Sequence, residues 1–145
     1  MNDPEACIHA CNKLLRGELT AIETYTHVIG NCDEQVVVHT LDRIRDDHEQ
    51  NANILRFHLS ALGAVPDAGP GIWGAVEQTM ENAAALVSDA AAITALIGSE
   101  RIRIREYENA LLDPDLKEEI KVRLRDENLP RLRDHVVSLE VVTAR

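Results

Sequence analysis

Apolar residues recur every three or four positions along four long segments of this chain, which is the spacing of an α-helix with one buried face. These segments cover about residues 4–30, 33–63, 89–112 and 114–142. Helices that each carry one apolar face bury it by packing against one another. The pattern therefore predicts an all-α fold, a bundle of four long helices.

Capping residues mark the ends of these segments. Asp3-Pro4 predicts an N-cap with proline at the first helical position, and Gly30-Asn31 predicts a left-handed stop. Gly63 is placed to end the second helix in the same way. Pro130 has no amide donor and lies inside the last segment, so we expect that helix to bend near Asn128.

The stretch between the second and third long helices is the one substantial connection. Residues 63–74 hold four glycines and two prolines, which is typical of a loop. A short helix is expected over about residues 72–86, and Ser88 or Asp89 can cap the long helix that follows. A connection of this length predicts a long crossover between helices 2 and 3 of the bundle.

Composition indicates a single domain over residues 1–145. Aromatic residues make up 3% of the chain, so Leu, Ile, Val and Ala must build the core, which suits packed helices. A chain of this length buries about 68–70% of its unfolded surface, enough for a core without staples. The cysteines are Cys7, Cys11 and Cys32, an odd number that argues against a disulfide framework and favours a cytoplasmic location.

Charge and hydropathy narrow the range of partners. The formal net charge of −10 repels a phosphate backbone, so we expect no nucleic acid partner and regard cations as the favoured small partners. No run of about 18 apolar residues occurs in the sequence, so no membrane partner is expected either.

One polar residue interrupts the apolar face of each long segment, and the four are Glu18, His48, Glu100 and His135. Their neighbours three, four and seven positions away are mostly apolar, so each side chain should point into the core. An acid or imidazole that is buried without a partner costs several kcal/mol. We therefore expect the four side chains to meet at one site.

Two interpretations of this site stay open. In the first, the carboxylates and neutral imidazoles bind an iron, manganese or zinc ion, whose charge offsets the two buried acids. In the second, the acids form a metal-free polar layer with Arg45, Arg103 or Arg131, and the protein is a structural or interaction bundle.

The two halves of the chain repeat part of this pattern. Tyr25 follows Glu18 by seven residues, and Tyr107 follows Glu100 by the same interval. Each tyrosine thus shares a helix face with its glutamate, two turns away. The two hydroxyls are candidate hydrogen-bond donors to site residues on a neighbouring helix.

The other cysteines and histidines have simpler interpretations. Cys7 and Cys11 lie one turn apart on an inward face, where cysteine usually fills core volume. His27, His39 and His58 show no partner pattern and are expected at the surface or its boundary.

The chain resembles the ferritin-like superfamily, and within it a bacterial four-helix-bundle family catalogued as a domain of unknown function. The resemblance covers nearly the whole chain and lies in residues 16–25 and 98–107, the crossover, and Leu129-Pro130 before His135. Di-iron members of the superfamily place Glu on helices 1 and 3 and Glu-x-x-His on helices 2 and 4. The resemblance thus implies that Glu18, His48, Glu100 and His135 are metal ligands, and it implies a role in stress or metal handling.

The sequence departs from the superfamily pattern at two positions. Arg45 and Leu132 stand three residues before the two histidines, where the resemblance implies carboxylates that bridge two metal ions. Asp47 adjoins His48 but points about 100° away around the helix, so it offers limited compensation. We therefore expect a single or incomplete dinuclear site, with weak oxidase activity at most.

A homodimer is also an expectation from the resemblance, because ferritin-like bundles often pair side by side. Valines at residues 36–38 and 136–137 provide apolar surface for such pairing.

Overall fold

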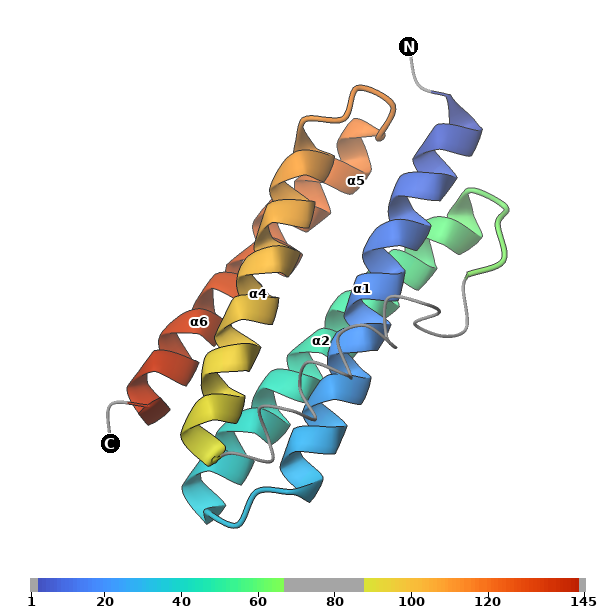
Figure 1. Cartoon of the computed structure of the whole chain (residues 1–145). Coiled ribbons are helices and arrows are strands. Elements are labelled where there is room, and N and C mark those ends of the chain that lie inside the picture. Colours follow the sequence, from blue (N-terminus) through green and yellow to red (C-terminus); the bar gives the residue numbers. More distant parts are fainter. Residues whose placement is uncertain (1–2, 67–87, 144–145) are drawn as a thin grey trace.

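The computed structural model describes residues 3–66 and 88–143, which form helices joined by short turns, with no strand in either range. The helical elements are α1 (Pro4–Gly30), α2 (Gln35–Ala61), α4 (Asp89–Leu111), α5 (Glu118–Arg123), the π-helical turn η1 (Leu124–Asn128) and α6 (Leu129–Thr143). Helices α1 and α2 form one antiparallel hairpin, and α4 and α6 form a second hairpin beside it (Figure 1). The expected all-α helical bundle is confirmed for the described residues.

The crossover and the short helix expected over residues 63–86 fall, from residue 67 onward, outside the described residues. Within the described part of the chain, no helix combines the length and the apolar character that crossing a membrane requires.

Helix ends follow the capping residues at most positions. The Asp3 side chain accepts a hydrogen bond of 3.1 Å from the Glu5 amide, and Gly63 has a φ of 77° after α2. The left-handed stop predicted at Gly30-Asn31 is wrong, because Asn31 has a φ of −114°. The Asn31 amide instead bonds the Val28 carbonyl, so the last turn tightens and satisfies a terminal carbonyl without a left-handed residue.

The last helical segment begins later than predicted. Pro114 was expected to open it, but α5 starts at Glu118. The Asp113 side chain accepts a hydrogen bond of 2.9 Å from the Asp115 amide, and the Leu116 amide bonds the Asp113 carbonyl. These bonds hold residues 113–116 in a turn, since an aspartate side chain competes with the helix for nearby amides.

An irregular turn occupies the position where Pro130 was expected to disturb the helix. The Leu129 amide bonds the Leu124 carbonyl, five residues back, and residues 124–128 form the π-helical turn η1. Proline donates no amide bond, and its ring clashes with the carbonyl four residues before it. A widened turn relieves this clash while the helix continues into α6.

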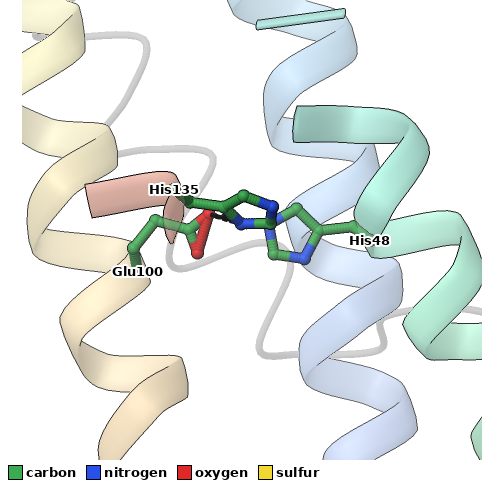
Figure 2. A group of neighbouring side chains, drawn as sticks. All are labelled: His48, Glu100 and His135. Carbon is green, nitrogen blue, oxygen red and sulfur yellow. Dashed lines mark hydrogen bonds and ion pairs between the residues drawn. The ribbon is translucent and has the colours of Figure 1, made fainter. Parts of the chain in front are cut away.

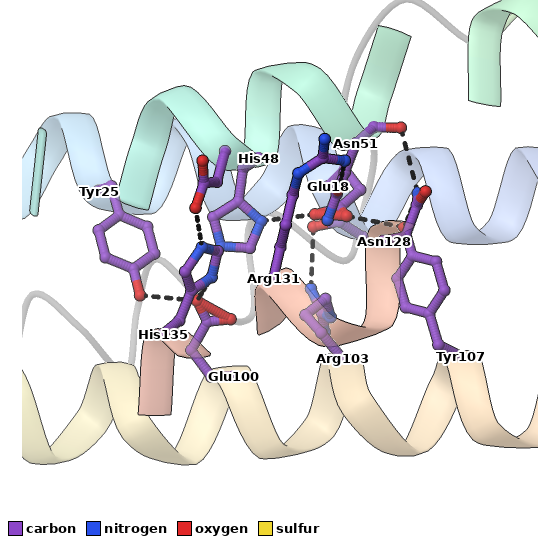
Figure 3. Close-up of polar contacts among 12 residues, drawn as sticks. Glu18, Tyr25, His48, Asn51, Glu100, Arg103, Tyr107, Asn128, Arg131 and His135 are labelled. Carbon is purple, nitrogen blue, oxygen red and sulfur yellow. Dashed lines mark hydrogen bonds and ion pairs between the residues drawn. The ribbon is translucent and has the colours of Figure 1, made fainter. Parts of the chain in front are cut away.

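A layer of polar side chains divides the bundle core into two apolar clusters. Leu15, Leu55 and Leu124 are fully buried in one cluster, and Leu41 and Leu96 are fully buried in the other. The aliphatic core confirms the expectation from composition. The polar layer lies between the clusters near the middle of each long helix, and it contains Glu18, His48, Glu100 and His135 (Figure 3).

Cys7 and Cys11 belong to the first apolar cluster, and both are free and fully buried. Burial, together with the neighbouring Cys7 thiol, raises the pKa of Cys11 to about 12. The Cys11 thiol therefore stays protonated near neutral pH, and the full burial of both cysteines shows that they fill core volume as expected.

Candidate metal centre

All four polar residues predicted to point inward are buried in the middle of the bundle. Glu18, His48 and His135 are 0% exposed, and Glu100 is 1% exposed. Each comes from a different long helix, in the order α1, α2, α4 and α6. The helical periodicity of the sequence therefore placed all four correctly.

His48 lies between the two buried glutamates. Its Nδ1 is 2.5 Å from Glu18 Oε1, and its Nε2 is 2.8 Å from Glu100 Oε1. A carboxylate only accepts hydrogen bonds, so both ring nitrogens donate and the imidazole carries a positive charge. Burial opposes this charge, but Glu100 and Glu18 together outweigh burial and raise the pKa of His48 to about 10.

His135 occupies an equivalent position between two carboxylates. Its Nδ1 is 2.8 Å from Glu100 Oε1, and its Nε2 is 2.9 Å from Asp47 Oδ2. Burial opposes the imidazolium charge here too, but hydrogen bonds to Asp47 and Glu100 raise the pKa of His135 above its ordinary value. The hydrogen bond from His135 also lowers the pKa of Asp47.

Asp47 is the site residue that the sequence did not reveal. It does point away from His48, as its position on α2 predicted, but this direction faces α6 and His135. Its contact depends on where α2 lies against α6, which helical periodicity within α2 does not specify. The adjacent acid Asp46 is exposed, so the sequence held no signal that separates the two.

Glu100 is the centre of the cluster. Its Oε1 atom is within hydrogen-bond distance of His48, His135 and the Tyr25 hydroxyl, the last at 3.0 Å. Burial raises the pKa of this carboxyl, but His48 and His135 outweigh burial and lower the pKa to about 2. The second oxygen, Oε2, is buried without a hydrogen-bond partner, so one carboxylate lone-pair direction is open to a ligand.

The two tyrosines connect the hairpins in a reciprocal way, as Figure 3 shows. Tyr25 on α1 donates to Glu100 on α4, while Tyr107 on α4 donates to Glu18 Oε2 on α1 over 2.7 Å. The Asn128 side-chain amide donates to the Tyr107 hydroxyl over 3.2 Å. The expected tyrosine hydrogen bonds to site residues on a neighbouring helix are therefore confirmed.

Two of the arginines considered as partners for the buried acids bind elsewhere. Arg45 forms an ion pair of 2.6 Å with Asp42 on the outside of α2. Arg131 donates to the Asn51 side-chain oxygen over 3.2 Å. Histidine and tyrosine side chains thus supply hydrogen bonds to the glutamates at the positions where the sequence suggested arginine.

The third arginine is buried beside the polar layer. Arg103 is 4% exposed, donates to the Gly17 carbonyl over 3.0 Å and forms an ion pair of 2.7 Å with Glu106. A Cβ atom at Gly17 would lie 3.2 Å from Arg103 Cδ, so glycine allows this arginine to pass close to α1.

Of the three histidines expected at the surface or its boundary, two lie there. His39 is exposed and His27 is partly buried, at the boundary. The same prediction is wrong for His58, which is 7% exposed and has a buried Nε2 atom without a hydrogen-bond partner. Burial and the nearby Arg123 charge lower the pKa of His58, so its imidazole is predominantly neutral near neutral pH.

Three of the four predicted residues bring potential ligand atoms to one point. One atom from each of His48, Glu100 and His135 lies within 4.8 Å of the other two, and Figure 2 shows these side chains pointing toward one another. Glu18 binds the opposite edge of His48, so it lies outside this group. Two donors that are each about 2.1 Å from an ion, at right angles to one another, are about 3 Å apart. The observed 2.8 Å between Glu100 Oε1 and either histidine nitrogen is a hydrogen-bond distance that is close to that spacing.

A known family corresponds to most of this chain. Residues 6–113 match the family described as Domain of unknown function (DUF2383). The chain belongs to this family. The DUF2383 match includes Glu18, His48 and Glu100, whereas His135 lies beyond it. No curated protein and no solved structure matches the chain.

Proposed function

We propose that this DUF2383 protein is a single-domain ferritin-like bundle that binds one divalent iron, manganese or zinc ion through His48, Glu100 and His135. The observation that carries the proposal is the meeting of these ligand atoms around Glu100, whose Oε2 atom has no hydrogen-bond partner. Two imidazole nitrogens and a carboxylate are a common ligand set for these metals.

Charge balance supports the exchange of protons for a metal ion. With His48 and His135 protonated, the carboxylates of Glu18, Glu100 and Asp47 leave a formal charge of about −1 on the cluster. A divalent ion that replaces one proton on each histidine leaves the same formal charge. The surrounding buried groups would therefore meet no new uncompensated charge when the ion binds.

Glu18 would complete the site from the far side of His48. A carboxylate that accepts a hydrogen bond from one ring nitrogen fixes the tautomer and makes the other nitrogen a better ligand. The 2.5 Å contact between Glu18 and His48 Nδ1 is of this kind, and it leaves Nε2 directed at Glu100. The four residues identified in the sequence thus act as one unit, with Glu18 as the orienting group.

Metal handling is better supported than efficient oxidation chemistry. The two positions that would carry bridging carboxylates are occupied by Arg45, which pairs with Asp42, and by Leu132, which is fully buried. These residues provide no anionic ligand for a second ion. A role in metal handling under stress, with weak oxidase activity at most, fits this ligand set.

A metal-free structural or interaction bundle is the second candidate function. Its supporting observation is that every ring nitrogen of His48 and His135 already has a carboxylate partner within 2.9 Å. Of the valines expected to provide apolar surface for a homodimer, Val37 is buried at 3% exposure, whereas Val36 and Val137 are 49% and 60% exposed and stay available in this case too. Sedimentation of the purified protein would test that pairing.

The test is elemental analysis of protein purified without an affinity tag or chelator, followed by thermal unfolding with added Fe(II), Mn(II) or Zn(II). We expect close to one ion per chain and a raised melting temperature, because a ligand at about one hundred times its Kd stabilises by about 2.7 kcal/mol. Glu100→Gln should abolish the metal-dependent shift. Glu23→Gln, which removes an exposed carboxylate from α1, should preserve it.

The metal-free bundle predicts a different result in the same experiment. If wild-type protein retains no ion after anaerobic incubation and desalting, and its melting temperature does not change with any of the three metals, the metal-free bundle is the better description.

A further inference from the structure

An ion that binds at His48, Glu100 and His135 needs a route through the bundle. The side chains of these three residues are 0%, 2% and 0% exposed. Among the described side chains that hydrogen-bond to them directly, Asp47 alone reaches solvent, with 31% of its side chain exposed. Glu18 and Tyr25, the other partners, are both buried.

Asp47 lies on the seam between α2 and α6. Three hydrogen bonds cross this seam, and they join Arg43 to Ser138 at 2.9 Å, Asp47 to His135 at 2.9 Å and Asn51 to Arg131 at 3.2 Å. The three α2 residues are four positions apart, so they form one row along the helix. The Asp47 contact is the central one of the row.

His135 connects this row to the interior. Its Nε2 atom faces Asp47 at the seam, while its Nδ1 atom faces Glu100 in the core. A single imidazole ring therefore separates the partly exposed carboxylate from the buried one. Both nitrogens are potential metal ligands, one on each side of the ring.

Charge makes Asp47 decisive for a cation at this seam. Arg43 and Arg131 lie close enough that their charges lower the pKa of Asp47, and both occupy the same row. Without the carboxylate, an approaching cation would meet two guanidinium groups and no anion in this row. With the Asp47 carboxylate present, its negative charge partly cancels this repulsion next to His135.

We propose that divalent cations enter the bundle through the α2–α6 seam, and that Asp47 is the positioning residue that attracts the ion and directs it to His135. This inference rests on the proposed metal site and adds its route of entry. Asp47 controls how fast the ion arrives, whereas His48, Glu100 and His135 determine how many ions stay bound.

The opposite seam, between α1 and α4, is a poorer entrance. A groove of about 290 Å³ lies along it, and its lining includes Lys13, Leu14 and Glu106 but none of the three proposed ligands. The buried Arg103 side chain lies next to this groove, bound to the Gly17 carbonyl and paired with Glu106. A cation entering here would have to pass a buried positive charge.

Rates of Co(II) uptake test the route, with the metal-free full-length chain mixed with Co(II) and the visible absorbance followed in time. Asp47→Asn keeps the shape of the side chain and removes its charge, so we expect uptake about tenfold slower, with one ion per chain still bound at saturating Co(II). Asp46→Asn is the matched control, because it removes an exposed charge one residue away. Glu106→Gln tests the opposite seam. The uptake rates of Asp46→Asn and Glu106→Gln should stay within about twofold of the wild-type rate.

Ionic strength provides a second measurement. Added salt screens the attraction between Asp47 and the ion, so wild-type uptake should slow more than uptake by Asp47→Asn. An unchanged rate in Asp47→Asn, or a slow rate in Glu106→Gln, would overturn the proposed entrance. A lower ion count in Asp47→Asn at saturating Co(II) would make Asp47 a ligand and also overturn its role as an entrance residue. If wild-type protein takes up no Co(II) at all, both the proposed metal site and the proposed entry route are wrong.

Discussion

Tyr107 on α4 donates a hydrogen bond of 2.7 Å to Glu18 Oε2 on α1. A second hydrogen bond joins the same two helices in the opposite sense, because Tyr25 on α1 donates to Glu100 on α4. On each helix the glutamate and the tyrosine are seven residues apart. Both hydrogen bonds therefore form only when α1 and α4 are aligned at this layer. The polar layer therefore also specifies the register between the two hairpins.

Removing the two tyrosine hydroxyls should have unequal effects on stability. Tyr107→Phe leaves Glu18 Oε2 without this donor and also removes the acceptor for Asn128, so we expect it to lower the free energy of unfolding by about 1–3 kcal/mol. Tyr25→Phe should cost less, because Glu100 Oε1 keeps both histidine donors. Urea unfolding of the metal-free variants measures the difference, and an equal or larger cost for Tyr25→Phe would contradict it.

The helical period explains why the buried residues could be predicted. Glu18, His48, Glu100 and His135 each lie among apolar neighbours on one face of their own helix, so burial follows from local sequence alone. The seven-residue intervals between glutamate and tyrosine were visible for the same reason. Burial of one face and spacing along that face are properties of single helices, and the structure confirms both.

The pairing between helices could not be predicted in the same way. The bond from His135 to Asp47 depends on the crossing of α2 and α6, and the bond from Arg103 to Gly17 depends on the close approach of α4 to α1. Helical periodicity specifies in which direction around the helix axis a side chain points. It does not specify which residues of the neighbouring helix lie at the same level along that axis. The late start of α5 after Pro114 was missed because the side chain of Asp113 holds a turn there.

Stability of the metal-free protein should fall as pH rises above neutrality. The pKa of His48 is about 10 in the folded protein against an ordinary value of 6.5, so its favourable contribution is complete below pH 6.5 and is lost as pH approaches about 10. Chemical denaturation across this interval should show the decline. His48→Gln should flatten the dependence, whereas His39→Gln, at an exposed position on the same helix, should leave it unchanged.

At acid pH a different group limits stability. The pKa of Glu100 is lowered from 4.5 to about 2, so its contribution is present above pH 4.5 and is lost as pH falls toward about 2. The metal-free protein should therefore be most stable between about pH 4.5 and 6.5, as far as these two groups decide it. A stability maximum measured near pH 9 would contradict the charged state of His48.

Metal affinity should have the opposite dependence on pH. A metal-bound imidazole must give up a proton, and in the metal-free cluster both ring nitrogens of His48 and of His135 face carboxylates, which only accept hydrogen bonds. Two displaced protons would raise the association constant for Zn(II) by up to about one hundredfold per pH unit. Competition with a chromophoric chelator at several pH values measures this slope, and an affinity independent of pH would exclude displacement of both protons.

Two helical glycines offer a test of the close approach between α1 and α4. A Cβ atom at Gly98 meets nothing within 4 Å, so Gly98→Ala should stabilise the protein by about 0.5–1 kcal/mol through helix propensity. At Gly17 the Cβ atom would lie 3.2 Å from Arg103 Cδ, and the buried arginine would have to shift. Gly17→Ala should therefore fail to show that gain, and thermal unfolding of the two variants compares them directly. Equal stabilisation would mean that Arg103 does not constrain this position.

Glu18→Gln separates two roles for the first residue of the site. In the proposed arrangement Glu18 orients His48 through Nδ1, and the ion binds on the Nε2 side. The variant should then retain one ion per chain with an affinity about 10–100 times weaker, since loss of such an orienting group has effects of that size. Equilibrium titration with Zn(II), compared with Glu23→Gln as an exposed control on the same helix, gives the two affinities. Complete loss of the ion would instead make Glu18 a direct ligand, and an affinity equal to that of the control would show that its contact with His48 plays no part in metal binding.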